Sequence, residues 1–212
     1  IYTTDVAVIR NSNADAVFAV YPFTPQPAIT QALLTVAECP VFVGVGGGTT
    51  TGKRSVQMAA VSEMQGAAGC VVNSPATAEM VEHITNIADI PVIATVVRCD
   101  DDAHAKVRAG AKILNIAAGK NTPQVLRELR EHYPNLPLIA PGGKTPESIR
   151  ETIAAGANAI IWTPPSAQQL QTDMMQRYRK MKEDATPVIS RDDVPIIDQV
   201  AAAEVSQVEN MN

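Results

Sequence analysis

Short apolar runs rich in Val and Ile recur along the whole chain and are separated by longer segments with helical character. Each run is apolar over nearly its entire length. Strands that are buried on both faces have this character, as in a parallel sheet covered by helices. The runs are Ala16–Val20, Val41–Val45, Gly69–Val72, Pro91–Val97, Lys112–Ile116, Leu136–Ala140 and Ala159–Trp162.

The segments between these runs carry helix signals. Met80, Ile84 and Ile87 form an apolar stripe at spacings of four and three residues, which is typical of one face of a helix. Two other segments begin with Thr122-Pro and Thr145-Pro, where a capping residue precedes a proline at the first helical position. The pattern predicts a regular alternation of strands and helices.

Three predicted helices end in a turn of small residues that leads directly into the next strand: Gln65–Gly69, Arg108–Lys112 and Ala155–Asn158. This repetition favours one α/β domain, a (β/α)8 barrel of the TIM type, with a doubly wound open sheet as the alternative. Seven strands are evident where a barrel has eight. We expect the eighth either before Ile1 or from the C-terminal tail.

We predict a single barrel domain over residues 1–185 and a C-terminal arm over residues 186–212. The tail holds two short apolar runs, 186–190 and 194–197, which are the candidates for the missing strand. The remainder is interrupted by a proline at position 195. We expect this arm to pack against a neighbouring subunit of a homo-oligomer.

The amino-acid composition limits the kinds of partner that we expect for this protein. Hydrophobic residues make up 46% of the chain but aromatic residues only 4%, so the core must consist of Ala, Val and Ile. The formal net charge is −5 and Lys and Arg form no long cluster, which argues against nucleic acid as a partner. No apolar run reaches the roughly 18 residues that a membrane span requires, so we expect no membrane partner.

Cysteine and histidine positions predict neither a disulfide framework nor a metal site. Cys39, Cys70 and Cys99 are far apart and odd in number, so we interpret them as small core residues of a cytoplasmic protein. Each of the three histidines falls within a predicted helix and is interpreted as a solvated helix residue. We expect no metal and no cofactor.

In either α/β architecture, ligands bind beyond the carboxyl ends of the strands. This edge carries several cations and hydroxyls but one evident acid, Asp100, and we therefore expect a small anionic ligand such as a carboxylate or a phosphate ester. The alternative is that these loop ends are polar without binding anything. The candidate ligand-binding residues are Gly46, Gly47, Gly48, Lys53, Asn73, Ser74, Arg98, Asn115, Gly142, Gly143 and Lys144.

The stretch VGVGGGTTTGKRS, residues 43–55, contains the pattern G-x-x-x-x-G-K of a nucleotide-binding P-loop from Gly47 to Lys53. That loop requires Ser or Thr directly after the lysine, to place a hydroxyl on magnesium. Here the position is Arg54, and Ser55 comes one residue late. We interpret the stretch as a glycine-rich strand end and keep nucleotide hydrolysis as the weaker alternative.

The segment APGGKTPES, residues 140–148, is the stronger anion-site candidate. A strand ends, two glycines let the backbone approach a ligand, and a helix begins at Thr145. Unpaired backbone N–H groups at a helix start favour phosphate or carboxylate. The alternative is a plain Gly-Gly turn in which Thr145 caps the helix.

From Ala16 to Ser166 the chain resembles the class I aldolases that cleave 2-keto-3-deoxy-6-phosphogluconate and 4-hydroxy-2-oxoglutarate, which are ribulose-phosphate-binding TIM barrels. The matching segments are short and rich in glycine and alanine: residues 43–47, 65–75, 90–93 and 140–144. The resemblance implies a barrel with a phosphate-binding glycine turn at the last of these segments.

The catalytic residues of that family are not matched. Its Schiff-base lysine falls on Leu114, its glutamate on Ala19, and its second phosphate-binding turn on residues 163–166. Lys112 has the same strand parity as Leu114 but lies one layer deeper. The candidate catalytic residues are Lys112, Lys120 and Asp100.

The favoured hypothesis is a small-molecule enzyme of this aldolase-like type, with a phosphorylated or carboxylated, keto-acid-like substrate and carbon–carbon lyase chemistry as the first guess. The alternative is a non-catalytic ligand-binding or regulatory barrel. An enzyme predicts a titratable side chain with a perturbed pKa at the pocket mouth, whereas a binding barrel predicts a pocket lined by Asn, Thr and backbone.

Overall fold

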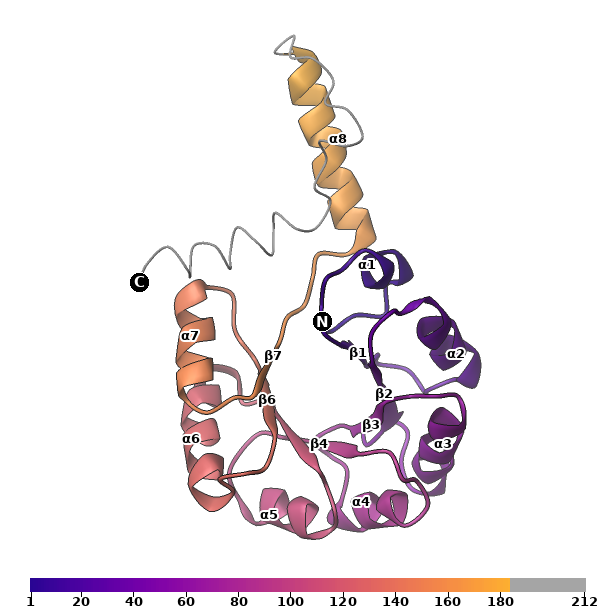
Figure 1. The fold of residues 1–212 in the computed structure, drawn as a ribbon, viewed down its shortest axis with the longest axis vertical. Coiled ribbons are helices and arrows are strands. Elements are labelled where there is room, and N and C mark those ends of the chain that lie inside the picture. Colours follow the sequence, from indigo (N-terminus) through magenta and orange to yellow (C-terminus); the bar gives the residue numbers. More distant parts are fainter. Residues whose placement is uncertain (184–212) are drawn as a thin grey trace.

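The computed structural model describes residues 1–183, which form a ring of parallel strands surrounded by helices (Figure 1). The strands follow one another around the ring in chain order, and each pairs in parallel with the next. All seven predicted strands are present. They are β1 (Val17–Ala19), β2 (Val41–Gly46), β3 (Gly69–Val72), β4 (Val92–Val96), β5 (Ile113–Ile116), β6 (Leu138–Pro141) and β7 (Ala159–Ile161).

The first three residues lie between β7 and β1. The backbone N–H of Tyr2 donates to the carbonyl of Trp162 at 2.8 Å, and Tyr2 forms a parallel bridge with Phe18. The N–H of Phe18 donates to the carbonyl of Ile1 at 2.6 Å. Residues 1–3 thus occupy the position of the eighth strand, and the fold is a (β/α)8 barrel. The proposed arm over residues 186–212 lies outside the described residues.

Helices follow the strands and cover the outside of the ring (Figure 1). Thr145 caps its helix as predicted, through a side-chain oxygen that accepts from the Ser148 N–H. Thr77 caps another helix in the same way, by accepting from the Met80 N–H. Thr122 is instead the first helical residue rather than the cap. The helices are α1 (Val6–Arg10), α2 (Pro27–Val36), α3 (Lys53–Met64), α4 (Ala78–Thr85), α5 (Asp101–Arg108), α6 (Thr122–His132), α7 (Pro146–Ala154) and α8 (Ala167–Glu183), with a short 3-10 turn, η1 (Gly119–Asn121).

The main core fills the layer between strands and helices. Alternate strand residues such as Val43, Cys70 and Leu114 pack there against helix residues such as Met58 and Ile84. Burial raises the pKa of the Cys70 thiol to about 12, so this cysteine is an inert core residue, as the sequence predicted. Cys39 and Cys99 are only half-buried.

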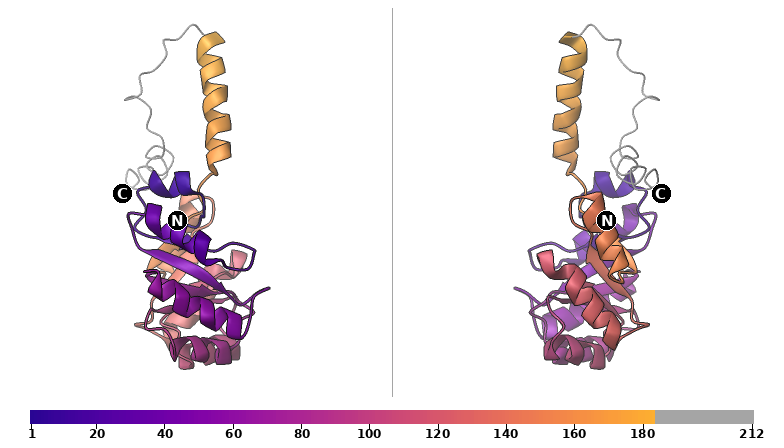
Figure 2. Two further views of the ribbon diagram at one scale, coloured as in Figure 1. Left: turned by 90° about the vertical axis from the view of Figure 1, so that its right-hand side faces the viewer. Right: turned by 90° about the vertical axis from the view of Figure 1, so that its left-hand side faces the viewer.

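Helix α8 departs from this ring and extends away from the barrel (Figures 1 and 2). Its side chains Met175 and Tyr178 are exposed. Within residues 1–183, no helix combines the length and apolar character of a membrane span.

Candidate functional site

The interior of the barrel changes from apolar to polar toward the carboxyl ends of the strands. Phe18, Val71 and Ile93 form a buried cluster inside the ring, and Ile113 packs against it. Because side chains alternate between the two faces of a strand, Thr95 and Asn115 face inward one layer above Ile93 and Ile113. The mouth of the barrel is therefore polar above a closed hydrophobic floor.

Thr95 and Asn115 are paired across neighbouring strands. Asn115 Nδ2 donates to Thr95 Oγ1 at 3.2 Å, and Asn115 is only 9% exposed. The Oδ1 atom of Asn115 is buried and has no hydrogen-bond partner among residues 1–183. A buried polar atom without a partner costs roughly 1–3 kcal/mol, so this amide is suited to a ligand or a water molecule in the mouth.

A pocket of about 220 Å³ opens beside the ends of β1, β2 and β3. Among the described residues, neither an acidic residue nor a Lys, Arg or His lines it, and Tyr21 is the one titratable group in its wall. The Tyr21 hydroxyl accepts from the Gln26 N–H at 3.0 Å. The lining residues are Val20, Tyr21, Pro22, Phe23, Pro25, Gly44, Gly46, Gly48, Thr49, Thr50 and Asn73.

The glycine-rich loop that follows β2 folds back on itself. The carbonyl of Thr50 accepts from both the Gly47 N–H at 2.8 Å and the buried Ser55 hydroxyl at 3.0 Å. Gly46 and Gly47 adopt φ angles of 136° and 97°, which favour glycine. The Ser55 hydroxyl, which follows the P-loop-like lysine, is therefore engaged in a buried hydrogen bond rather than free to bind a magnesium ion. This geometry argues against the nucleotide-hydrolase alternative.

The glycine turn before α7 is closed by the protein's own groups. The hydroxyls of Thr145 and Ser148 each accept the other residue's N–H in a capping box. The Glu147 carboxylate has a lowered pKa because its own backbone N–H and the Thr145 hydroxyl hydrogen-bond to it. A Cβ on Gly142 would lie 2.7 Å from Ile160, so close packing explains that glycine. An incoming anion would compete with Glu147 for these donors, which favours the plain-turn interpretation.

The other predicted residues lie around the rim at different distances from the pocket. Gly46, Gly48 and Asn73 line it, whereas Lys53 opens α3 and lines a second, larger hollow of about 560 Å³ between α3 and α4. The Ser74 carbonyl accepts from Lys106. The remaining rim candidates, Arg98, Asp100, Lys120, Gly143 and Lys144, are exposed and border neither hollow.

One candidate catalytic residue, Lys112, lies elsewhere than the sequence suggested. Lys112 is exposed and precedes the first residue of β5, at the end of the strand opposite the mouth. Asp100 caps α5, where its carboxylate accepts from the Ala103 N–H at 3.0 Å. Lys120 lies in η1, two residues after the end of β5, and its catalytic role stays a prediction.

The aldolase alignment places its catalytic positions on the wrong face of the strands. Leu114 and Ala19, on which the lysine and glutamate fall, both belong to the core that faces the helices. Asn115 and Val20 are the inward neighbours. A shift of one residue moves every side chain of a strand to the opposite face. Sequence reasoning also missed Thr95, although its position two residues after the inward Ile93 could have indicated it.

Comparison with known proteins identifies the fold of the chain but not the family to which it belongs. No protein-family model matches the sequence, and no curated protein matches it. Solved structures match at low identity. Phosphonopyruvate hydrolase, in a complex with oxalate and Mg²⁺, is 14% identical with a TM-score of 0.65, covering 99% of this chain and 92% of its own.

Two further solved structures are similar to nearly the whole chain, again at low sequence identity. Phosphoenolpyruvate phosphomutase from Streptomyces platensis subsp. rosaceus is 15% identical with a TM-score of 0.64, over 99% and 92% of the two chains. A 2,3-dimethylmalate lyase of the PEP mutase/isocitrate lyase superfamily is 14% identical with a TM-score of 0.62, over 99% and 91%. These likenesses confirm the TIM-barrel fold. None of these three structures is an aldolase of the family suggested by the sequence.

Proposed function

We propose that the protein is a small-molecule enzyme that binds a small carboxylate or phosphate-bearing, keto-acid-like molecule at the mouth of the barrel, with carbon–carbon lyase chemistry. The observation that carries this proposal is the buried Thr95–Asn115 pair, at the place where TIM-barrel enzymes bind substrates. Asn115 Nδ2 has a second N–H that can donate to an anion, and its unpaired Oδ1 can accept from a hydroxyl of the ligand. The structural neighbours named above act on phosphonopyruvate, phosphoenolpyruvate and 2,3-dimethylmalate, which are all small carboxylates.

A pocket at the same end of the barrel, beside β1, β2 and β3, has a size and charge that fit such a ligand, although Thr95 and Asn115 do not line it. A pocket of about 220 Å³ is smaller than the roughly 300–1,000 Å³ typical of drug-sized ligands. Since no carboxylate lines the pocket and exposed cations stand around the rim, an anion meets little repulsion there. Lys120 is the rim residue that we propose as the proton-transfer group, because it follows Asn115 on the same strand end.

A non-catalytic ligand-binding barrel is the second candidate. The observation that favours it is the pocket wall itself, in which backbone, Thr and Asn supply nearly all the polar atoms. An enzyme of this class requires at least one group that moves a proton at the ligand. Turnover therefore distinguishes the two candidates, whereas binding alone does not.

Replacing Asn115 with Leu should weaken ligand binding roughly tenfold or more, because a hydrogen bond to a charged ligand is worth about 1.5–3 kcal/mol. Titration calorimetry with oxalate, pyruvate and phosphoenolpyruvate, each with and without Mg²⁺, measures the effect. Lys112→Met, at the opposite end of β5, is the control and should bind like the wild type. Failure of all three probes to bind the wild type would refute the proposed ligand class.

The catalytic proposal is tested on the same panel by following product formation. Lys120→Met should remove turnover while leaving binding within a few-fold of the wild type. Borohydride trapping with pyruvate tests whether a lysine forms an imine. Binding without turnover in the wild type would select the non-catalytic barrel.

We also propose that the protein is a homo-oligomer, in which the projecting helix α8 packs on a second copy. The exposed Met175 and Tyr178 on this helix support the proposal. The full chain should have the mass of an oligomer in light scattering, and Met175→Glu together with Tyr178→Glu should shift it toward the monomer. A monomeric full chain would contradict the proposal.

A further inference from the structure

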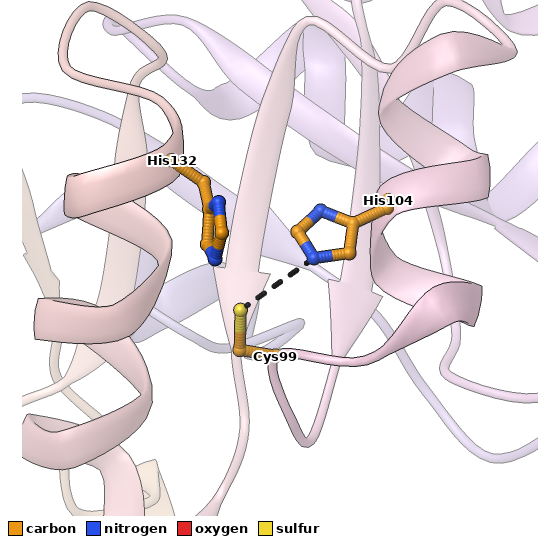
Figure 3. Close-up of side chains that lie close together, drawn as sticks. All are labelled: Cys99, His104 and His132. Atoms are coloured by element: carbon orange, nitrogen blue, oxygen red, sulfur yellow. Dashed lines mark hydrogen bonds between the residues drawn. The ribbon is translucent and has the colours of Figure 1, made fainter.

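Cys99, His104 and His132 converge outside the barrel mouth, between helices α5 and α6 (Figure 3). Cys99 lies in the connection from β4 to α5, His104 in the first half of α5, and His132 at the end of α6. Figure 3 shows the three side chains pointing toward one another in front of the strands. None of them lines either of the hollows described above.

The distances suit a single metal ion. One ligand atom from each residue lies within 4.8 Å of the other two, and Cys99 Sγ lies 3.9 Å from His104 Nε2. In a tetrahedral zinc site, with Zn–S of about 2.3 Å and Zn–N of about 2.0 Å, sulfur and nitrogen ligands lie about 3.5 Å apart. Side-chain movements of roughly an ångström would bring the three atoms to that geometry.

A neighbouring hydroxyl fixes the orientation of the His104 ring. His104 Nδ1 lies 2.7 Å from the Tyr133 hydroxyl. When Nδ1 carries the proton and donates to Tyr133, the lone pair of Nε2 is directed at the Cys99 sulfur. Metal-binding histidines are oriented in this way by a hydrogen bond from their second ring nitrogen.

The surroundings of Cys99 are negatively charged. The carboxylates of Glu128 and Glu131 from α6 and of Asp100 from the same connection lie near the Cys99 thiol. The same carboxylates attract a divalent cation, whose positive charge then favours the thiolate. The thiol proton is released to solvent when the metal–sulfur bond forms.

We propose that Cys99 Sγ, His104 Nε2 and a ring nitrogen of His132 bind one Zn²⁺ ion, with Tyr133 as the positioning residue. A thiolate with two imidazoles is a ligand set for zinc rather than for magnesium or calcium. His132 is exposed, so the fourth position is open to water. The ion joins the β4–α5 connection to the end of α6. This site departs from the expectation of no metal, because the spacing in sequence gave no sign of it.

Cobalt titration of the chelator-treated full chain tests the proposal. One equivalent of Co²⁺ should bind and give a thiolate-to-cobalt charge-transfer band, which Zn²⁺ then abolishes by displacement. The band should disappear in Cys99→Ala. His104→Ala and His132→Ala should weaken Co²⁺ binding at least tenfold, and Tyr133→Phe should weaken it roughly 10–100-fold.

The controls are Cys39→Ala and His83→Ala, which remove residues of the same kinds elsewhere and should retain the band. Circular dichroism confirms that each variant is folded. Each of the four substitutions at the site is made and tested separately, so one unfolded variant does not prevent the test. Absence of a thiolate band in wild-type protein with Co²⁺, or its persistence in folded Cys99→Ala, would overturn the zinc site.

Discussion

Gly46→Ala is expected to lower the free energy of unfolding by about 3 kcal/mol or more, the sum of backbone strain and overpacking, each roughly 1–3 kcal/mol. A Cβ at this position would lie 2.2 Å from Ser55 Oγ and 2.5 Å from the Thr50 carbonyl oxygen. The φ angle of 136° is also one that alanine rarely adopts. Because Thr50 and Ser55 hold the loop after β2 together, the substitution should disrupt the wall of the pocket as well.

Urea denaturation followed by circular dichroism measures the loss, and Gly48→Ala provides the matched control. The nearest atom to a Cβ on Gly48 is Asn73 Nδ2 at 3.6 Å, which is ordinary contact, and its φ angle is not left-handed. We expect that variant to stay within about 1 kcal/mol of the wild type. Equal losses in the two variants would show that the loop does not have the packed conformation described above.

The strands and helices could be predicted because the sequence repeats one local pattern. The run Gly69–Val72 coincides with β3, and Val41–Val45 ends one residue short of β2. These strands are buried on both faces, so each appears as a continuous apolar run between polar turns. The glycines that stop the helices, such as Gly156 with its φ of 107°, mark the boundaries equally well.

The same continuous burial hides which face of each strand looks inward. Where both faces are apolar, no alternation distinguishes them, and the aldolase alignment placed Leu114 inward instead of Asn115. The resemblance supplied a register that the residues themselves did not determine. The partly unpaired amide, which identifies the candidate site, becomes visible only in three dimensions.

Contacts between side chains on separate helices cannot be predicted from the sequence, for a related reason. His132 ends α6 and Cys99 precedes α5, and only the packing of both helices on the sheet brings them together. A local spacing rule finds metal ligands on one hairpin or one helix, whereas here the third ligand comes from another βα unit. For the same reason Lys106, in a helix with many charged residues, could not be recognised as buried.

Lys106 of α5 connects this helix to the mouth of the barrel through a hydrogen bond to the Ser74 carbonyl. Its side chain is fully buried, and Nζ donates to Asp102 Oδ2 at 2.6 Å and to the Ser74 carbonyl at 2.7 Å. Ser74 lies in the connection between β3 and α4, next to the pocket residue Asn73. A buried ammonium requires such partners, because its transfer out of water is costly.

Asp102→Ala is therefore expected to lower the free energy of unfolding by about 3 kcal/mol, because it leaves a buried charge with a single carbonyl. The value lies at the lower end of the range for buried pairs, since the Asp102 side chain is 55% exposed and water can partly replace it. Asp101→Ala removes a neighbouring acid from the same first turn of α5 and controls for the helix dipole. Adding Lys106→Met to Asp102→Ala should restore part of the lost stability, because the methionine fills the space without a charge. Urea denaturation of the four proteins separates the effects, and a double variant less stable than Asp102→Ala would show that the ammonium is not desolvated.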